Sequence, residues 1–151
     1  APGLGEVRSM PRPEGMVVIS SPVVKFPTKT MITAPKYVDK INALGAKALV
    51  SFMERTSIEN LMLQSRLFWA GVGIEGERML SALKLFERAG VEHPSVKKGI
   101  VFGVIRRGDL GPIAERLGCA RPGPGAQTPL TLHGADGINL IVTEIAKGGA
   151  C

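Results

Sequence analysis

The sequence predicts a mainly α protein, in which a helical bundle or hairpin core carries an extended Pro-rich N-terminal arm and a short C-terminal β-hairpin. Six prolines within the first 35 residues remove backbone donors at intervals too short for a helix. Apolar residues recur at helical spacing over 35–118, and a Gly/Pro-rich stretch opens the remainder. We therefore divide the 151 residues into an arm (1–34), a helical core (35–118) and a linker with a hairpin tail (119–151).

Two short apolar runs in the arm, 16–19 and 22–26, are compatible with edge strands. Pro22 and Pro27 bound these runs tightly, because proline donates no hydrogen bond to a β-ladder. The arm is therefore expected to be extended, outside the helical core.

The first helix of the core should begin at Pro35, because the first helical position tolerates a residue without an N–H. Residues at three- and four-residue steps then form one apolar face, and the helix should end near Glu54. The members of this face are Val38, Ile41, Gly45, Ala48, Leu49 and Phe52.

Two further helices follow. A capping box at Thr56-Ser-Ile-Glu59 opens the second, which should stop at Gly71 or Gly73. The third has acidic residues in its first turn, basic residues near its end and Gly90 just beyond, as the helix dipole favours. We expect the buried faces of these two helices to contain Ile58, Leu61, Met62, Phe68 and Trp69, and Met79, Leu80, Leu83 and Phe86, respectively.

Residues 94–108 fit two structures. Val101, Val104 and Ile105 suit a helix, but the apolar run 99–105 could equally be a buried strand. We favour the helix, followed by a short helix over 109–117. Residues 131–133 and 138–145, which flank a turn at 134–137, predict the C-terminal hairpin.

Composition excludes several classes of protein. With 44% hydrophobic residues the chain is not disordered throughout, and no apolar run reaches the roughly 20 residues of a membrane span. Cys119 and Cys151 are too few for a disulfide-rich scaffold or a zinc ligand set. The N-terminal residues lack the pattern of a signal peptide, so we expect no secretion by that route.

The segment Gly71-Val-Gly-Ile-Glu-Gly76 matches the glycine spacing of dinucleotide-binding loops, and Glu92 lies about 20 residues further on. Such a loop requires a preceding strand, whereas the preceding residues are predicted helical, so a turn between helices is favoured. His93 and His133 have no partners at metal or catalytic spacing. We therefore expect no catalytic residues, no metal, no cofactor and no enzymatic activity.

The basic residues suggest a polyanionic partner. The net charge is +6, and Lys36, Lys40 and Lys47 form a stripe on the first helix, away from its apolar face. Such a layout suits sequence-independent contacts with phosphate, although an ordinary solvated face has the same pattern. The candidate nucleic-acid-binding residues are Lys36, Lys40, Lys47, Arg55, Arg66, Lys84 and Arg88.

The layout resembles that of the major coat proteins of filamentous and rod-shaped archaeal viruses. The local resemblance runs from Met79 to Gly108 and rests on Leu83-Lys84, Gly90, Pro94 and the apolar run 100–105. It implies a subunit that wraps double-stranded DNA, with itself or a paralogous subunit as polymer partner, located in the virion or the host cytoplasm. It further implies that the cations of the first two helices face phosphate. The low number of amide side chains, three Asn and two Gln, favours a thermostable protein.

The leading hypothesis is therefore a structural subunit that self-assembles and coats nucleic acid as a helical filament. Two alternatives stay open. One is an accessory structural subunit of a large complex such as a ribosome or respiratory assembly. The other is a small nucleotide-binding domain that uses the Gly71–Gly76 loop.

Overall fold

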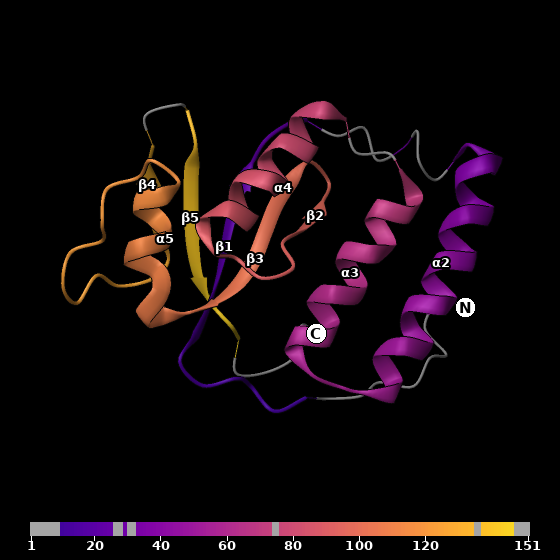
Figure 1. Cartoon of the computed structure of the whole chain (residues 1–151), viewed down its shortest axis with the longest axis horizontal. Coiled ribbons are helices and arrows are strands. Elements are labelled where there is room, and N and C mark those ends of the chain that lie inside the picture. The colour runs from indigo at the N-terminus through magenta and orange to yellow at the C-terminus, as the bar shows by residue number, and fades with distance from the viewer. Residues whose placement is uncertain (1–9, 26–28, 30–32, 74–75, 135–136, 147–151) are drawn as a thin grey trace.

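The computed structural model describes residues 10–25, 29, 33–73, 76–134 and 137–146. These residues form an α/β fold, so the predicted mainly α class is wrong. Within the described ranges, four α-helices, a 3-10 turn and five strands follow one another (Figure 1). The strands are β1 (Met16–Pro22), β2 (Ser95–Lys97), β3 (Ile100–Arg106), β4 (Leu130–His133) and β5 (Asn139–Glu144). The helices are α2 (Pro35–Glu54), α3 (Ile58–Val72), α4 (Glu77–Ala89) and α5 (Leu110–Arg116), with the 3-10 turn η1 at Arg107–Asp109.

All five strands belong to one sheet, in the order β2-β3-β1-β5-β4, and each neighbouring pair is antiparallel. The predicted arm thus contributes the central strand rather than an edge strand. Prolines did not prevent this, because Pro22 occupies the last position of β1 and the six residues before it contain none. Val17 and Ile19 are completely buried on the face of β1 that meets the helices.

The predicted helix over 94–108 is also wrong, since these residues form the β2–β3 hairpin. Burial alternates along β3, with Val101, Gly103 and Ile105 buried and their neighbours more exposed. Lys98 and Gly99 both have positive φ and make the tight turn between the strands. All of β3 pairs with β1, and these inter-strand contacts stabilise the strand, although the apolar spacing of the segment also suits a helix.

The C-terminal hairpin is confirmed as an element, with β4 paired to β5. However, β5 also pairs with β1 from Val17↔Glu144 to Ser20↔Ile141. The hairpin is thus part of the five-stranded sheet and not a separate tail.

The first helix is confirmed at both ends, Pro35 and Glu54. It packs on α3, where Gly71 allows close approach, since a Cβ there would lie 2.8 Å from Leu44 Cδ1. No residue of α2 is buried, and Leu49, expected on the apolar face, is 61% exposed. The α2 helix is therefore a peripheral element beyond α3 (Figure 1).

The ends of α3 match the prediction closely. Ser57, not Thr56, is the N-cap, and its hydroxyl accepts a hydrogen bond from Asn60 N–H at 3.1 Å. Gly73 ends the helix in the left-handed conformation. Of the expected buried face only Met62 is fully buried, whereas Leu61 is exposed.

The α4 helix and α5 cover one face of the sheet (Figure 1). Met79, Leu83 and Phe86 of α4 are buried as expected, and Leu80 is exposed. Side chains from all three predicted segments meet in this core. Its largest fully buried members are Phe86, Ile19, Leu83, Leu140, Val17, Val101 and Val142.

Cys119 is buried in this core as a free thiol, and burial raises its pKa. Cys151 lies outside the described residues. Among the helices of the described ranges, none combines the length and hydrophobicity that crossing a bilayer requires.

Glu144 joins three parts of the chain at the surface. Its carboxylate accepts hydrogen bonds from Arg107 and from Thr128 Oγ1 (2.9 Å), and pairs with Arg12 at 3.3 Å. The hydrogen bond from Arg107, followed by that from Thr128, holds the pKa of Glu144 below its ordinary value. A lowered folded-state pKa stabilises the fold above the unfolded pKa, and this stabilisation is lost as pH falls through the folded pKa.

We therefore expect Glu144→Gln to lower the melting temperature at neutral pH and to melt like the wild type in acid. The two curves should converge below the ordinary glutamate pKa of about 4.3. Glu14→Gln is the control, because Glu14 is exposed and has no ion pair with another described residue. Melting followed by circular dichroism from pH 7 to pH 2 measures this, and an equal difference at every pH would contradict the assignment.

Candidate functional site

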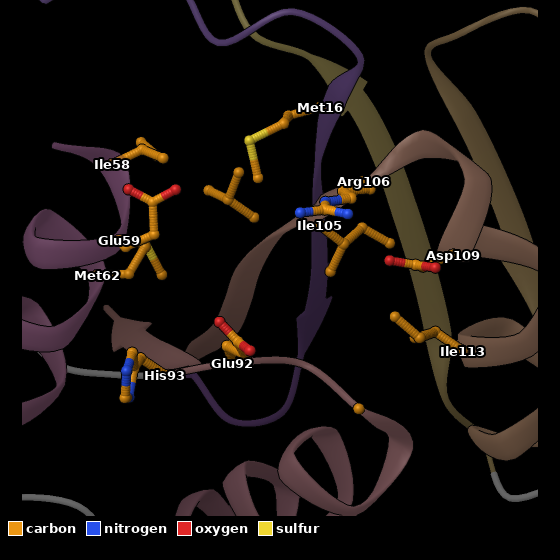
Figure 2. Close-up of a pocket in the computed structure, with 12 residues that line it drawn as sticks. Met16, Ile58, Glu59, Met62, Glu92, His93, Ile105, Arg106, Asp109 and Ile113 are labelled. Carbon is orange, nitrogen blue, oxygen red and sulfur yellow. The ribbon is translucent and has the colours of Figure 1, made fainter.

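A pocket of about 360 Å³ opens just before the start of β2, beside the part of β3 that β2 leaves uncovered. The short β2 pairs only with Ile100–Phe102, so among the described strands the Gly103–Arg106 half of β3 has a neighbour on the β1 side alone. The start of α3, the loop after α4, and the η1–α5 segment surround this uncovered half (Figure 2). The lining residues are Met16, Ile58, Glu59, Met62, Gly90, Glu92, His93, Val104, Ile105, Arg106, Asp109 and Ile113.

The polar groups of the pocket come from separate elements. Arg106 ends β3, Asp109 immediately precedes α5, and Glu59 lies in the first turn of α3. Glu92 and His93 lie in the loop between α4 and β2, and His93 has the left-handed φ of 48°. Figure 2 shows Met62 beside Glu59 on one side of the pocket, and Ile105 and Ile113 near Arg106 and Asp109 on the other side.

All five polar side chains are exposed, and none forms an ion pair or hydrogen bond with another residue of the described ranges. The Arg106 guanidinium is therefore available for an anionic group, and the three carboxylates for hydroxyl groups or cations. No group of three or more potential ligands among the described residues could hold a metal ion. The pocket is thus suited to a small ligand that carries both an anionic group and hydroxyl groups.

The predicted nucleic-acid-binding residues lie elsewhere. Lys36, Lys40 and Lys47 are exposed on α2, as is Arg55 just after it, and the Lys36 Nζ lies 4.9 Å from the centre of the Tyr37 ring. Lys84 and Arg88 are exposed on α4, with α3 between α4 and α2 in Figure 1. Arg66 is part-buried on α3 and its Nε lies 3.6 Å from Glu87 Oε1 of α4. None of the seven lines the pocket, and their contact with phosphate stays a prediction.

The Gly71–Gly76 segment connects two helices, as the sequence indicated. Gly71 lies within α3, Gly73 caps it and Gly76 is the N-cap of α4. Residues 74 and 75 lie outside the described ranges. A helix precedes this loop where a dinucleotide-binding loop requires a strand, so the glycine spacing here serves helix packing and capping.

Arg106 and Asp109 were not predicted as site residues, because residues 94–108 were expected to form a helix and residues 109–117 a second, short one. Had 99–105 been assigned as a strand, its end at Arg106 would have been the signal, since charged residues at strand ends often line sites. Glu92 and His93 were noted individually, but nothing local showed that they line the same pocket as Arg106.

No protein-family model and no curated protein sequence matches the chain. The fold matches that of a known phosphotransferase. Its description is "Phosphotransferase related to CoA biosynthesis pathway", and the superposition has a TM-score of 0.73 at 17% sequence identity. It covers 97% of this chain and 43% of the phosphotransferase, so the chain spans less than half of that protein's length. At this identity the likeness concerns the fold.

This likeness overturns the resemblance to viral coat proteins, and with it the capsid and virion assignment. The resemblance rested on residues 79–108 as a helix, a turn and a second helix. They form α4 and then the β2–β3 hairpin, so the supposed second helix is a strand of the sheet. The expectation of a non-enzymatic chain is corrected by the same finding, because this fold occurs in a phosphotransferase.

Proposed function

We propose that this chain is a domain of a small-molecule phosphotransferase and that the pocket beside β3 forms part of its substrate site. The observation that carries the proposal is the fold, which superposes over 97% of the chain on a phosphotransferase. The superposition covers 43% of that protein, so the fold of this chain corresponds to less than half of it.

The chemistry of the pocket supports this role. Enzymes catalyse phosphoryl transfer mainly by positioning the reactants and by stabilising charge on the phosphoryl oxygens. Arg106 can bind two oxygens of a phosphate or carboxylate at once, which fixes the orientation of the substrate. Asp109, in the turn that follows Arg106, is the group that we assign to the acceptor hydroxyl as hydrogen-bond acceptor and proton acceptor.

In the proposed reaction the acceptor oxygen attacks the γ-phosphorus of a nucleoside triphosphate. The bond from the γ-phosphorus to the β–γ bridging oxygen breaks, a bond from the γ-phosphorus to the acceptor oxygen forms, and the nucleoside diphosphate leaves. The hydroxyl proton passes to the carboxylate of Asp109 and then to water. Every step requires only the two substrates and the magnesium that accompanies the nucleotide.

The name of the structural neighbour suggests the substrate class. We propose a small, hydroxyl-bearing precursor of coenzyme A as the acceptor. The pocket volume of about 360 Å³ falls at the lower end of the roughly 300–1,000 Å³ typical of small-molecule sites. An acidic group of the substrate would pair with the Arg106 guanidinium, and its hydroxyl groups would donate hydrogen bonds to the carboxylates of the pocket.

A small nucleotide-binding domain was one alternative from the sequence, and the proposed phosphotransferase would also bind a nucleotide. The Gly71–Gly76 segment is a helix–turn–helix connection, so we assign no dinucleotide-type loop to it. The nucleotide-binding class itself remains part of the proposed function.

Thermal denaturation with and without ligands tests the proposal at the level of binding. A ligand that binds only the folded protein at 100 times its Kd stabilises it by about 2.7 kcal/mol. We expect ATP and at least one hydroxyl-bearing precursor of coenzyme A to raise the melting temperature. Unchanged melting with ATP and with every such precursor would contradict the proposed function.

A further inference from the structure

The part of β3 that lines the pocket in Figure 2 has an unpaired backbone edge. On its other side, β3 pairs with β1 along its whole length. On the pocket side, β2 pairs only with Ile100–Phe102, and none of the described strands continues the sheet beside Val104 and Arg106. An unpaired strand edge presents backbone N–H and C=O groups that can bind an extended ligand.

The groups at this edge follow from the hydrogen bonds between β1 and β3. The Arg107 N–H donates to the Gly15 carbonyl oxygen at 2.8 Å, one position beyond the last pair of the β1–β3 register. In an antiparallel pair, successive residues direct their N–H and C=O groups alternately to the two sides of the strand. The odd-numbered residues of β3 therefore bond to β1, and Val104 and Arg106 direct their backbone groups to the uncovered side.

Three of these backbone groups are unpaired. The Arg106 carbonyl accepts the first hydrogen bond of η1, because Arg106 is the N-cap of that turn. The Val104 N–H, the Val104 C=O and the Arg106 N–H have no hydrogen-bond partner in the described part of the chain. The edge thus offers a ligand one acceptor between two donors.

The loop before β2 keeps this edge uncovered. If the β2–β3 register continued by two more residues, His93 would lie opposite Val104. Instead, His93 has the left-handed φ of 48°, which is uncommon for residues other than glycine and is further disfavoured by the fully buried Pro94 that follows. Such strain persists only where the surrounding structure fixes it, and it is common at ligand sites. The fold therefore accepts an energetic cost at the point where the chain would otherwise cover the edge.

The Arg106 side chain adds a positive charge beside the edge. Its guanidinium lines the same pocket and forms no ion pair with another described residue. A carboxylate at this end of the edge can accept from the Arg106 N–H and also pair with the guanidinium. A carboxylate is favoured over a doubly charged group, because Glu59, Glu92 and Asp109 also line the pocket and repel further negative charge.

The Val104 carbonyl oxygen requires a donor on the same ligand. A residue of a paired strand directs its own N–H and its own C=O to the same side, so an amide N–H next to a carboxylate matches the Val104 C=O and the Arg106 N–H. An N-acylated amino acid carries these two groups at that spacing. Met62 and Ile113 provide apolar surface in the pocket for its acyl group.

We propose that the uncovered edge of β3 binds an N-acylated amino acid, whose carboxylate lies at the Arg106 N–H and guanidinium and whose amide N–H donates to the Val104 carbonyl oxygen. This inference rests on the proposed function, which makes the pocket the substrate site, and it names the substrate class. The acceptor of the phosphoryl group then carries a carboxylate and a secondary amide in addition to its hydroxyl group.

Calorimetric titration with N-acetylglycine tests the proposal, with N-acetylsarcosine as the matched control, because a methyl group replaces its amide hydrogen. We expect N-acetylglycine to bind, and N-acetylsarcosine to bind at least about fivefold more weakly, since the Val104 carbonyl oxygen loses its donor. N-acetylglycinamide lacks the negative charge and should also bind at least about fivefold more weakly. Arg106→Gln should weaken binding of N-acetylglycine, whereas Arg88→Gln, outside the pocket, should leave it unchanged.

Amide hydrogen exchange followed by NMR locates the bound probe. In the free protein the Arg106 N–H should exchange faster than the N–H groups of Gly103 and Ile105, which point to β1. N-acetylglycine at several times its Kd should slow exchange at Arg106 at least about threefold. Gly103 and Ile105 are the internal controls, because their exchange should not change.

The proposal is overturned if N-acetylglycine does not bind at millimolar concentration, if N-acetylsarcosine binds equally well, or if exchange at Arg106 is unchanged by the bound probe. None of these measurements involves ATP. The proposal therefore fails alone if the probe does not bind while a precursor of coenzyme A without an amide is phosphorylated. Bound N-acetylglycine without phosphoryl transfer to any precursor would instead contradict the proposed function and support the ligand site.

Discussion

Gly99→Ala is expected to destabilise the protein by about 3 kcal/mol or more, the sum of a strained backbone and a collision. Gly99 has φ of +82° in the turn between β2 and β3, a conformation that side chains other than glycine adopt rarely. A Cβ there would lie 1.9 Å from the carbonyl oxygen of Val24. The N–H groups of Val23 and Val24 both donate to the Gly99 carbonyl oxygen, at 2.9 and 3.1 Å. The substitution therefore breaks the contact that holds the chain just after β1 against the β2–β3 turn.

Urea unfolding measures this effect, with Gly125→Ala as the control. Gly125 also has a positive φ, of +71°, but no heavy atom lies within 4 Å of the position of its Cβ. It should cost only about 1 kcal/mol, from the backbone conformation alone. Equal losses for the two alanine variants would show that Val24 does not lie against Gly99, and would contradict the placement of the segment after β1 against the β2–β3 turn.

Arg106→Gln is expected to lower kcat/KM for phosphoryl transfer about a hundredfold, the usual effect of removing one preorganised group that stabilises transition-state charge. Arg106 is the guanidinium of the pocket beside β3, and its side chain forms no ion pair with another described residue. Its loss should therefore leave the stability of the fold nearly unchanged while it removes the anion-binding group. Glutamine keeps a hydrogen-bond donor of similar reach but lacks the charge.

Steady-state kinetics on wild type, Arg106→Gln and Arg88→Gln measures this effect. Arg88 is an exposed arginine of α4 outside the pocket, so its variant should retain wild-type kinetics. A fall shared by both variants would indicate a general effect of lost positive charge. Wild-type kinetics in Arg106→Gln would exclude Arg106 from the site.

Local signals predicted the helices well because their causes are local. Pro35 at the first position of α2 and Gly73 and Gly90 at the ends of α3 and α4 act through neighbouring backbone groups. The strands depend on distant partners instead. Val17 is paired with Ile105 on one side and Glu144 on the other, and no feature near Val17 identifies either partner.

The proline count led to the wrong class for a specific reason. Prolines near a segment limit the length of a strand, but they do not stop a short strand from lying at the centre of a sheet. In β1 the only proline is Pro22 at the last position, where the strand is about to leave the sheet. The length of the proline-free interval before Pro22, and not the number of prolines in the arm, shows that a strand can form there.

The pocket beside β3 was beyond sequence reasoning because five elements create it. Glu92 lies 33 positions after Glu59 and 14 before Arg106, and the three line one pocket only because β2 is short and α3 lies beyond it. The positions of the basic residues in the sequence did not show which of them have acidic partners in the fold. Arg66, predicted to contact phosphate, lies beside Glu87 between α3 and α4, a partner that helical periodicity alone does not show.

Phosphorus NMR of the purified natural protein with ATP, magnesium and individual hydroxyl-bearing precursors of coenzyme A tests whether this chain transfers phosphoryl groups. We expect that one precursor causes the γ-phosphate signal of ATP to disappear, with equal amounts of ADP and a new phosphate ester in its place. Intact ATP with every precursor, from protein whose circular dichroism shows the α/β fold, would contradict the assignment of this chain to a phosphotransferase.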